Sequence, residues 1–229
     1  DIPVDNLEAI PQIAEYLLDK KIVDPIVVSP DVGGTKRAIR LAKLIDAPLA
    51  IIDKRRPAHG ESKIMNVVGE VKGKTVILID DIIDTAGTIS KAAEVMLEKG
   101  AREVYICASH AVFSGKAIEK LGSDAIKEVI VTNTIKIADE KKIGKIKIIS
   151  VASLLSESIK SSIDEFIDDF IYDLFEPLDI KNIKGWDWPA LNQELNAHLL
   201  IEIDQSDFEA KSSKEDIVNS ISDKALEYY

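Results

Sequence analysis

Residues 76–88 read VILIDDIIDTAGT, and this stretch decides both the expected fold and the expected site. Apolar residues lead directly into Asp80 and Asp81, and a third carboxylate follows at Asp84. Such an apolar run predicts a strand that is buried in a parallel sheet and carries acids at its carboxyl end. Helical spacing then follows over residues 89–99, so the stretch predicts a strand, a short turn and a helix in succession.

The turn between this strand and helix has the features of a phosphate site. Thr85, Ala86, Gly87 and Thr88 would present backbone N–H groups and two hydroxyls at a helix N-terminus, which favours an anion. Neighbouring carboxylates suit a sugar phosphate, because ionised acids accept hydrogen bonds from vicinal hydroxyls. The alternative is a buried strand whose acids merely cap the next helix. Three acids together with this turn favour the sugar phosphate.

Strand and helix patterns alternate through the first two thirds of the chain. Their order predicts an α/β fold with a parallel sheet and helices on both faces, in which ligands bind beyond the carboxyl ends of the strands. A turn at Lys72 and Gly73 is expected to join two successive strands. Strands are predicted at 25–29, 49–52, 64–71, 74–80, 104–108, 128–132 and 145–151, and helices at 7–20, 36–45, 89–99 and 115–121.

Two further polar groups follow predicted strands. Asp31 precedes Gly33 and Gly34, which would let a diphosphate approach the backbone, and Asp31 could bind Mg²⁺ directly or through water. The run DKRR at 53–56 supplies three cations beside a polar stretch. Alone it would be a solvated charge run. Beside a phosphate site, it can neutralise charge that develops on a transferring phosphoryl group.

Charge divides the chain into two parts. Residues 1–160 contain 24 Lys and Arg against 23 Asp and Glu, a net charge of +1, whereas residues 161–229 contain 5 against 17, a net charge of −12. We therefore expect an α/β domain over 1–160 and an acidic helical module over 161–229. In the second part, helical spacing is expected from 163 to 175, from 186 to 199 and from 212 to 228. A continuous helix is expected from Ala152 through Phe175.

Composition excludes several classes of protein. The acidic second part argues against general nucleic-acid binding. No apolar run approaches the ~20 residues that a membrane-spanning helix needs. The single cysteine, Cys107, excludes an intrachain disulfide and fits a reducing compartment, so we expect a cytoplasmic protein. His110 and His198 stand alone and are expected to be structural.

Residues 1–159 resemble the carboxyl-terminal half of the ribose-phosphate pyrophosphokinase family. The resemblance is carried by VSPDVGG at 28–34, IIDKRRP at 51–57, NVVG at 66–69, DDIIDTAGT at 80–88 and VTN at 131–133. It implies a phosphoribosyltransferase-type fold and transfer of a diphosphoryl group from Mg-ATP to O1 of ribose 5-phosphate. It also implies roles for particular residues: the 5-phosphate on Asp84, Thr85, Ala86, Gly87 and Thr88, the ribose hydroxyls on Asp80 and Asp81, the diphosphate on Gly33 and Gly34, Mg²⁺ on Asp31, and stabilisation of the transferring group by Lys54 and Arg56 from a mobile loop.

The chain also departs from that family. Members of the family are about twice as long as the part of this chain that resembles them. Their additional amino-terminal half supplies a metal-binding His, much of the ATP site and much of the hexamer contact. Residues 164–229 instead resemble the helical scaffold and wing region of the SecA translocation ATPase, through FIDD at 166–169, WDWPAL at 186–191 and KALEY at 224–228. We therefore expect a truncated, fused or chimeric chain. It would bind ribose 5-phosphate or phosphoribosyl pyrophosphate but turn over poorly, and its partner would be the missing half or further copies of itself.

Two other functions remain open. A phosphoribosyltransferase, or a relative that only binds, would use residues 80–88 without ATP, and would release pyrophosphate from phosphoribosyl pyrophosphate when a base is supplied. A translocation-related interaction protein would owe its role to the acidic tail, which would bind a protein partner. Deletion of 161–229 would then abolish partner binding and leave sugar-phosphate binding intact.

Overall fold

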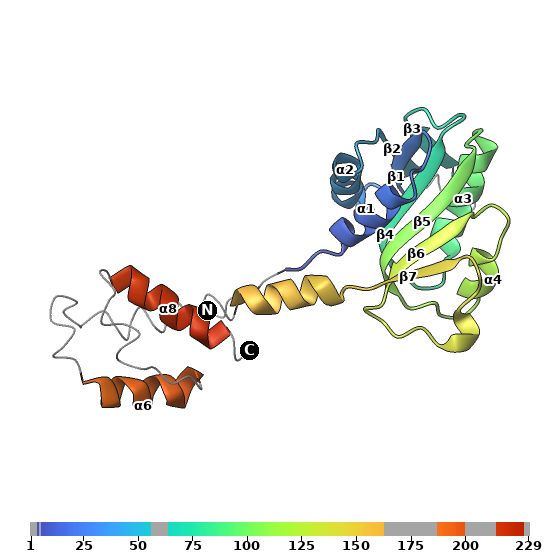
Figure 1. Ribbon diagram of the computed structural model, residues 1–229. Helices are drawn as coiled ribbons and strands as arrows, with labels where there is room; N and C mark the ends of the chain where they lie inside the picture. Colours follow the sequence, from blue (N-terminus) through green and yellow to red (C-terminus); the bar gives the residue numbers. More distant parts are fainter. Residues whose placement is uncertain (1–3, 5, 56–63, 163–186, 200–213, 227–229) are drawn as a thin grey trace. The chain divides into compact units, whose positions relative to one another are not determined.

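The computed structural model describes residues 4, 6–55, 64–162, 187–199 and 214–226. The chain divides into two compact units, Asp1–Leu154 and Leu155–Tyr229. The first unit is a sheet with helices on both faces, and the second contains helices α6 and α8 (Figure 1). Within the described ranges, no helix combines the length and the apolar character needed to cross a membrane.

The sheet of the first unit has seven strands in the order β3-β2-β1-β4-β5-β6-β7. Every neighbouring pair is parallel except β2 and β3, which are antiparallel. The strands are β1 Pro25–Ser29, β2 Leu49–Arg55, β3 Ile64–Val68, β4 Thr75–Ile83, β5 Glu103–Ala111, β6 Glu128–Thr132 and β7 Ile146–Ile149. The fold is therefore the predicted α/β sheet, with one antiparallel strand at its edge.

Each face of the sheet is buried under its own helices. Ile77 and Ile79 of β4 pack in one apolar cluster with α1 (Ile10–Asp19) and α2 (Thr35–Leu44). Val76 and Leu78, which alternate with them, pack in the other cluster with α3 (Gly87–Glu98) and α4 (Ala117–Leu121). Because both faces are covered, the central strands are apolar at successive positions rather than at every second one. A short 3₁₀ helix, η1, spans Asp139–Lys141.

Two details of the predicted sheet are wrong. The turn at Gly73 exists, with φ +74°, but it does not join neighbouring strands. β3 pairs instead with β2, from Ile51 opposite Val68 to Arg55 opposite Ile64, and two strands separate it from β4. The predicted strands 49–52, 74–80 and 104–108 also end too early, and the predicted strand 64–71 ends too late, because β3 stops at Val68. β2 continues through its charged residues because β3 pairs with them, and β4 continues to Ile83 because β5 pairs with it there.

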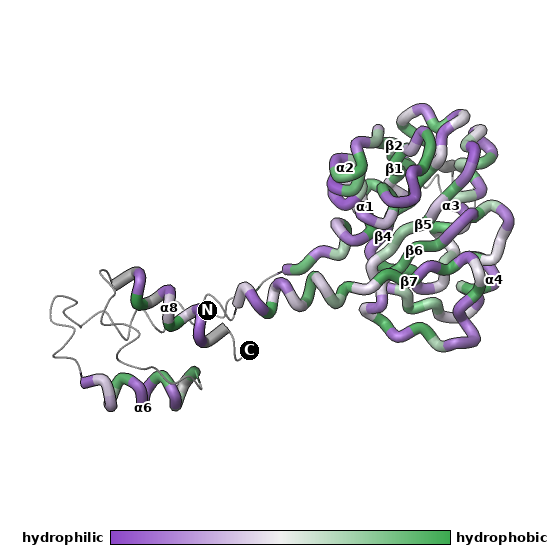
Figure 2. The backbone as a smooth tube through the Cα atoms, viewed as in Figure 1, coloured by the Kyte–Doolittle hydropathy of each residue, from purple (hydrophilic) through white to green (hydrophobic). Residues whose placement is uncertain are grey.

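In the second unit, α6 spans Trp188–Leu199 and α8 spans Lys214–Leu226. Asp187 begins α6, because its carboxylate accepts the N–H of Ala190 at 3.2 Å. Hydrophilic and hydrophobic positions alternate along α6 (Figure 2), and its buried residues recur at helical spacing: Trp188, Leu191, Leu195 and Leu199. Residues 152–162 are helical as predicted. The helix predicted over 163–175 and the helix start predicted at 212–213 lie outside the described residues.

Gly69, which follows β3, offers a stability test with an internal control. Its φ is +121°, and a Cβ there would lie 2.6 Å from Cβ of Ala50. Gly73 also has a positive φ, +74°, but a Cβ there would meet nothing within 4 Å. Gly69→Ala should lower the free energy of unfolding by about 2–4 kcal/mol through strain and overpacking. Gly73→Ala should cost only about 1 kcal/mol, from the backbone conformation. Urea denaturation followed by circular dichroism checks both values, and equal losses would contradict the close approach at Ala50.

Candidate functional site

Two loops lie at one edge of the sheet, near the end of β2, because β1 lies between β2 and β4 and runs parallel to both. The chain passes from β1 to α2 through residues 30–34, and from β4 to α3 through residues 84–86. Both loops therefore lie at the carboxyl edge, beside the end of β2. Lys54 lies within β2, opposite Met65 of β3, rather than beyond the strand. Arg56 lies outside the described residues.

Asp31 shapes the glycine-bearing loop after β1. Its carboxylate accepts the N–H of Gly34 at 2.9 Å, and its carbonyl accepts the hydroxyl of the buried Ser29 at 2.6 Å. A Cβ at Gly34 would lie 3.0 Å from the oxygen of that hydroxyl, so the position has no room for a larger side chain. The two hydrogen bonds of Asp31 therefore fix the loop, and α2 begins at Thr35, immediately after it.

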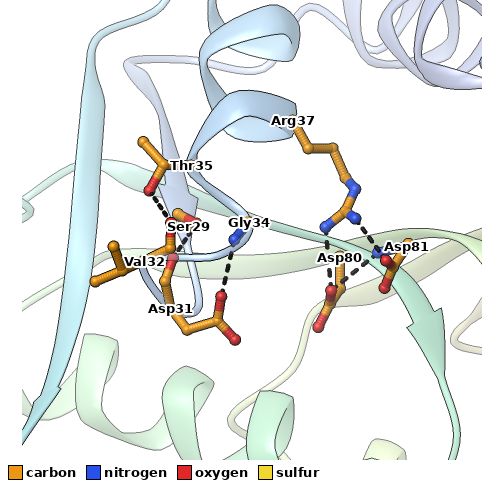
Figure 3. A network of polar contacts seen from close by, with 8 residues as sticks. All are labelled: Ser29, Asp31, Val32, Gly34, Thr35, Arg37, Asp80 and Asp81. Atoms are coloured by element: carbon orange, nitrogen blue, oxygen red, sulfur yellow. Dashed lines mark hydrogen bonds and ion pairs between the residues drawn. The ribbon is translucent and has the colours of Figure 1, made fainter.

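Asp80 and Asp81 share one cation, which the sequence reasoning missed. Arg37 Nη1 lies 3.2 Å from Asp80 Oδ1, and Arg37 Nη2 lies 2.6 Å from Asp81 Oδ2 (Figure 3). The N–H of Asp81 donates to the same oxygen of Asp80 at 2.9 Å. Arg37 comes from the first turn of α2, 43 residues away from Asp80. One feature of the sequence could have indicated this role for Arg37. It lies three residues after Gly34, which places its positive charge one helical turn from the glycine-bearing loop.

The two carboxyls differ in their readiness to ionise. Burial raises the pKa of Asp80 to about 6, and the neighbouring negative charge of Asp81 acts in the same direction, while Arg37 opposes both. For Asp81, partial burial is the largest effect and opposes ionisation, but the guanidinium of Arg37 and the hydrogen bonds to its carboxyl together outweigh burial and hold the pKa of Asp81 below its usual range. At neutral pH the pair therefore carries negative charge and accepts hydrogen bonds.

The turn after β4 is preformed around Ala86. Ala86 has φ +57°, in the left-handed region, and its side chain is buried in the core cluster beneath α3. α3 begins at the next residue, Gly87, and the N–H of Ser90 donates to the carbonyl of Ala86 at 3.0 Å. Thr85, Gly87 and Thr88 are exposed. The turn therefore presents its hydroxyl residues and the start of a twelve-residue helix outward.

Two residues that sequence reasoning missed brace this turn from the neighbouring chain segment. Ser114 donates its hydroxyl to the carboxylate of Asp84, and its N–H to the carbonyl of Asp84 at 3.0 Å. Lys120 of α4 donates from Nζ to the carbonyl of Thr85 at 2.8 Å. The Lys120 ammonium would also lie 3.5 Å from a Cβ at Gly87. No motif marks either residue, because both act through contacts that bridge at least 30 positions of sequence.

The remaining polar residues near the strand ends have structural partners. His110 Nδ1 lies 2.9 Å from the hydroxyl of Thr134, in agreement with the structural role expected for it. Asn133 accepts the N–H of Val151 at 3.0 Å and so fixes the segment after β7. Cys107 is fully buried, and burial raises the pKa of its thiol, which keeps the sulfur unreactive.

The strand order and the two loops at the carboxyl edge define a phosphoribosyltransferase-type α/β domain. A family model described as phosphoribosyl synthetase-associated domain matches residues 49–171, which is more than half of the chain. The chain belongs to this family. The match continues past the boundary predicted at 160/161, and the position of that boundary stays a prediction.

Relatives of known function show the same likeness. The chain is 53% identical over 160 residues to the ribose-phosphate pyrophosphokinase of Gloeobacter violaceus, covering 69% of this chain and 48% of the relative. It is 55% identical over 159 residues to that of Bacillus caldolyticus, covering 69% and 50%. The crystal structure of phosphoribosylpyrophosphate synthetase from Mycobacterium smegmatis superposes with a TM-score of 0.66 at 39% identity, covering 72% of this chain and 54% of that one.

These matches confirm the predicted family resemblance over the part of the chain that they cover. The chain spans about half the length of the curated relatives it matches. The resemblance of residues 164–229 to SecA, and a chimeric origin, stay predictions.

The opposite pKa shifts of Asp80 and Asp81 can be tested by titration. Asp80 should titrate near pH 6 and Asp81 below its usual range. The folded state holds the Asp80 proton more tightly than the unfolded chain does, where an ordinary aspartate titrates near 3.8. This group should therefore make the free energy of unfolding fall as the pH rises from about 4 to about 6. Carboxyl ¹³C NMR measures both midpoints, and Asp80→Asn assigns the upper one. Two midpoints near 4 would contradict the buried environment of Asp80.

Proposed function

We propose that the first unit binds ribose 5-phosphate or phosphoribosyl pyrophosphate and serves Mg-ATP-dependent diphosphoryl transfer to O1 of ribose 5-phosphate. The observation that carries this proposal is the Asp80–Asp81 pair directly beside the preformed turn at 84–88, on the edge that also holds the glycine-bearing loop. Membership of the phosphoribosyl synthetase-associated family supports it.

Each part of the edge has a chemical role in this proposal. The N-terminus of α3, with Thr85 and Thr88, takes the 5-phosphate, because unpaired backbone N–H groups and hydroxyls favour an anion there. Asp80 and Asp81 accept hydrogen bonds from the ribose hydroxyls. Residues Asp84, Ala86 and Gly87 complete the turn, and Gly33 and Gly34 let a diphosphate approach the backbone.

In the transfer step, the O1 hydroxyl of the sugar attacks the β-phosphorus of ATP and loses its proton to water, and the bond from that phosphorus to AMP breaks, so that AMP leaves. Lys54 and Arg56 are proposed to neutralise the charge that develops on the transferring group.

Asp31 fits the role of a single protein ligand to Mg²⁺. One of its carboxylate oxygens holds the N–H of Gly34, which leaves the other for a cation. In the part of the chain that the structure describes, no three His, Cys, Asp or Glu side chains cluster as a metal site. Magnesium commonly takes one or two carboxylates together with phosphate oxygens and water, so one carboxylate beside a diphosphate suffices. Bound there, Mg²⁺ would offset the negative charge of the phosphates.

Titration of ribose 5-phosphate into the chain tests the sugar-phosphate site. The unchanged chain should bind it with measurable heat, and Asp84→Asn combined with Thr88→Ala should weaken binding at least tenfold, since the Thr88 hydroxyl that is proposed to donate to the phosphate is lost and the Ser114 hydroxyl loses its charged acceptor in the turn. Asp124→Asn is the matched control, because Asp124 is fully exposed at the opposite end of the strands. Isothermal titration calorimetry gives all three affinities. Equal affinities would remove the central claim.

Turnover is a separate question, because the 229 residues span about half of their relatives. We propose that these residues alone bind the sugar phosphate but transfer slowly, since much of the ATP site is expected in the part of the relatives that has no match here. A coupled assay of AMP release with Mg-ATP and ribose 5-phosphate measures this. Turnover well below one per second supports the proposal, since enzymes commonly reach roughly 1–10³ per second, and turnover within that range contradicts it.

A further inference from the structure

Asp80 and Asp81 are neighbours on a strand, yet their carboxylates meet the same side chain. Successive residues of a strand point to opposite faces of the sheet, so two such acids ordinarily diverge. Here both reach the guanidinium of Arg37, at 3.2 Å and 2.6 Å (Figure 3). The register with β5 is the same on both sides of Asp81, with Asp80 opposite Ala108 and Ile82 opposite His110. The two acids therefore converge on Arg37 although the strand stays in register.

Arg37 divides the two carboxylates in a specific way. It takes one oxygen from each, Oδ1 of Asp80 and Oδ2 of Asp81, and Asp80 Oδ1 also accepts the N–H of Asp81. Because each carboxylate has about four lone-pair sites, both acids can still accept a hydrogen bond from another donor. Two carboxylates held on one guanidinium match the two adjacent O–H donors of a vicinal diol.

An arginine suits this task better than any other cation. Its planar guanidinium presents several donors in a fixed fork, whereas a lysine ammonium is a compact point charge. Its charge also offsets the repulsion between two adjacent carboxylates. The side chains of Arg37 and Asp80 are less than a third exposed, so water screens their ion pair only in part.

Arg37 also lies against the glycine-bearing loop. A Cβ at Gly34 would lie 3.5 Å from Arg37 Nη1, and Arg37 follows Gly34 by one helical turn. The hydrogen bond from Gly34 to Asp31 fixes that turn. The orientation of the two acids is therefore set by the same segment that forms the loop after β1.

We propose that Arg37 is a positioning residue that gathers Asp80 and Asp81 into one pair of acceptors for the vicinal hydroxyls of the sugar. This proposal rests on the function proposed for the same site and adds the residue that sets its preference for a diol. Arg37 itself keeps its contacts with the acids when the sugar binds.

The test compares ribose 5-phosphate with 2-deoxyribose 5-phosphate, which lacks one of the vicinal hydroxyls. Isothermal titration calorimetry of the full chain should give a roughly tenfold to hundredfold preference for ribose 5-phosphate, as expected for a hydrogen bond to a charged group. Arg37→Met should reduce this preference to within about threefold of unity, while the deoxy sugar still binds through its phosphate. Arg37→Lys, which keeps the charge but loses the fork, should also lose most of the preference.

Arg40→Met is the matched control. Arg40 lies one turn further along α2 and pairs with Glu8 at 2.7 Å, away from the two acids, so its loss should leave the preference unchanged. Circular dichroism confirms that each variant is folded. The proposal is overturned if both Arg37 variants keep the full preference, or if a folded Arg37→Lys chain loses both sugars alike. If the unchanged chain binds neither sugar, the proposed function fails instead.

Discussion

The parallel pairing of β1 with both β2 and β4 is the constraint on which the site depends. Parallel neighbours end at the same edge, so the loop after β1, the end of β2 and the turn after β4 are adjacent although they lie far apart in the sequence. The apolar clusters on both faces hold the register, because a slip would carry buried side chains of β4 out of their cluster. The chemistry at the edge is thus positioned by the packing beneath it.

Much of this could be predicted from the sequence, because the patterns involved are local. Apolar runs marked β1 and β6 at their observed limits, and helical spacing marked α2 and α3 to within two residues. The strand predicted over 64–71 begins at the correct residue but ends three residues too late, and its expected pairing was wrong. Glycine at position 73 indicates a turn, but nothing local distinguishes a turn between neighbouring strands from one that leads across the sheet. The pairing with β2 is set by the residues 51–55 that β3 faces.

The contacts that complete the site could not be predicted in this way. Arg37, Ser114 and Lys120 have partners 30 to 44 positions away, and each could have been a solvated surface residue by its type and neighbours. Only the folded sheet brings α2 against the end of β4, and α4 against the turn before α3. The acids and glycines were recognisable because they cluster in short motifs. The residues that hold them in place were not recognisable, because such a residue needs only a side chain that is long enough and polar or charged. Many positions of a sequence meet that requirement.

Ala86 adopts a conformation that ordinarily favours glycine, and its methyl group lies in the core. An alanine in the left-handed region costs about 1–2 kcal/mol, which the surrounding packing offsets. With a side chain anchored inside and a backbone that has few alternatives, the turn has little freedom to lose when a ligand arrives. Its shape is set during folding, so less of the binding free energy goes into ordering the chain, and more of it remains as affinity.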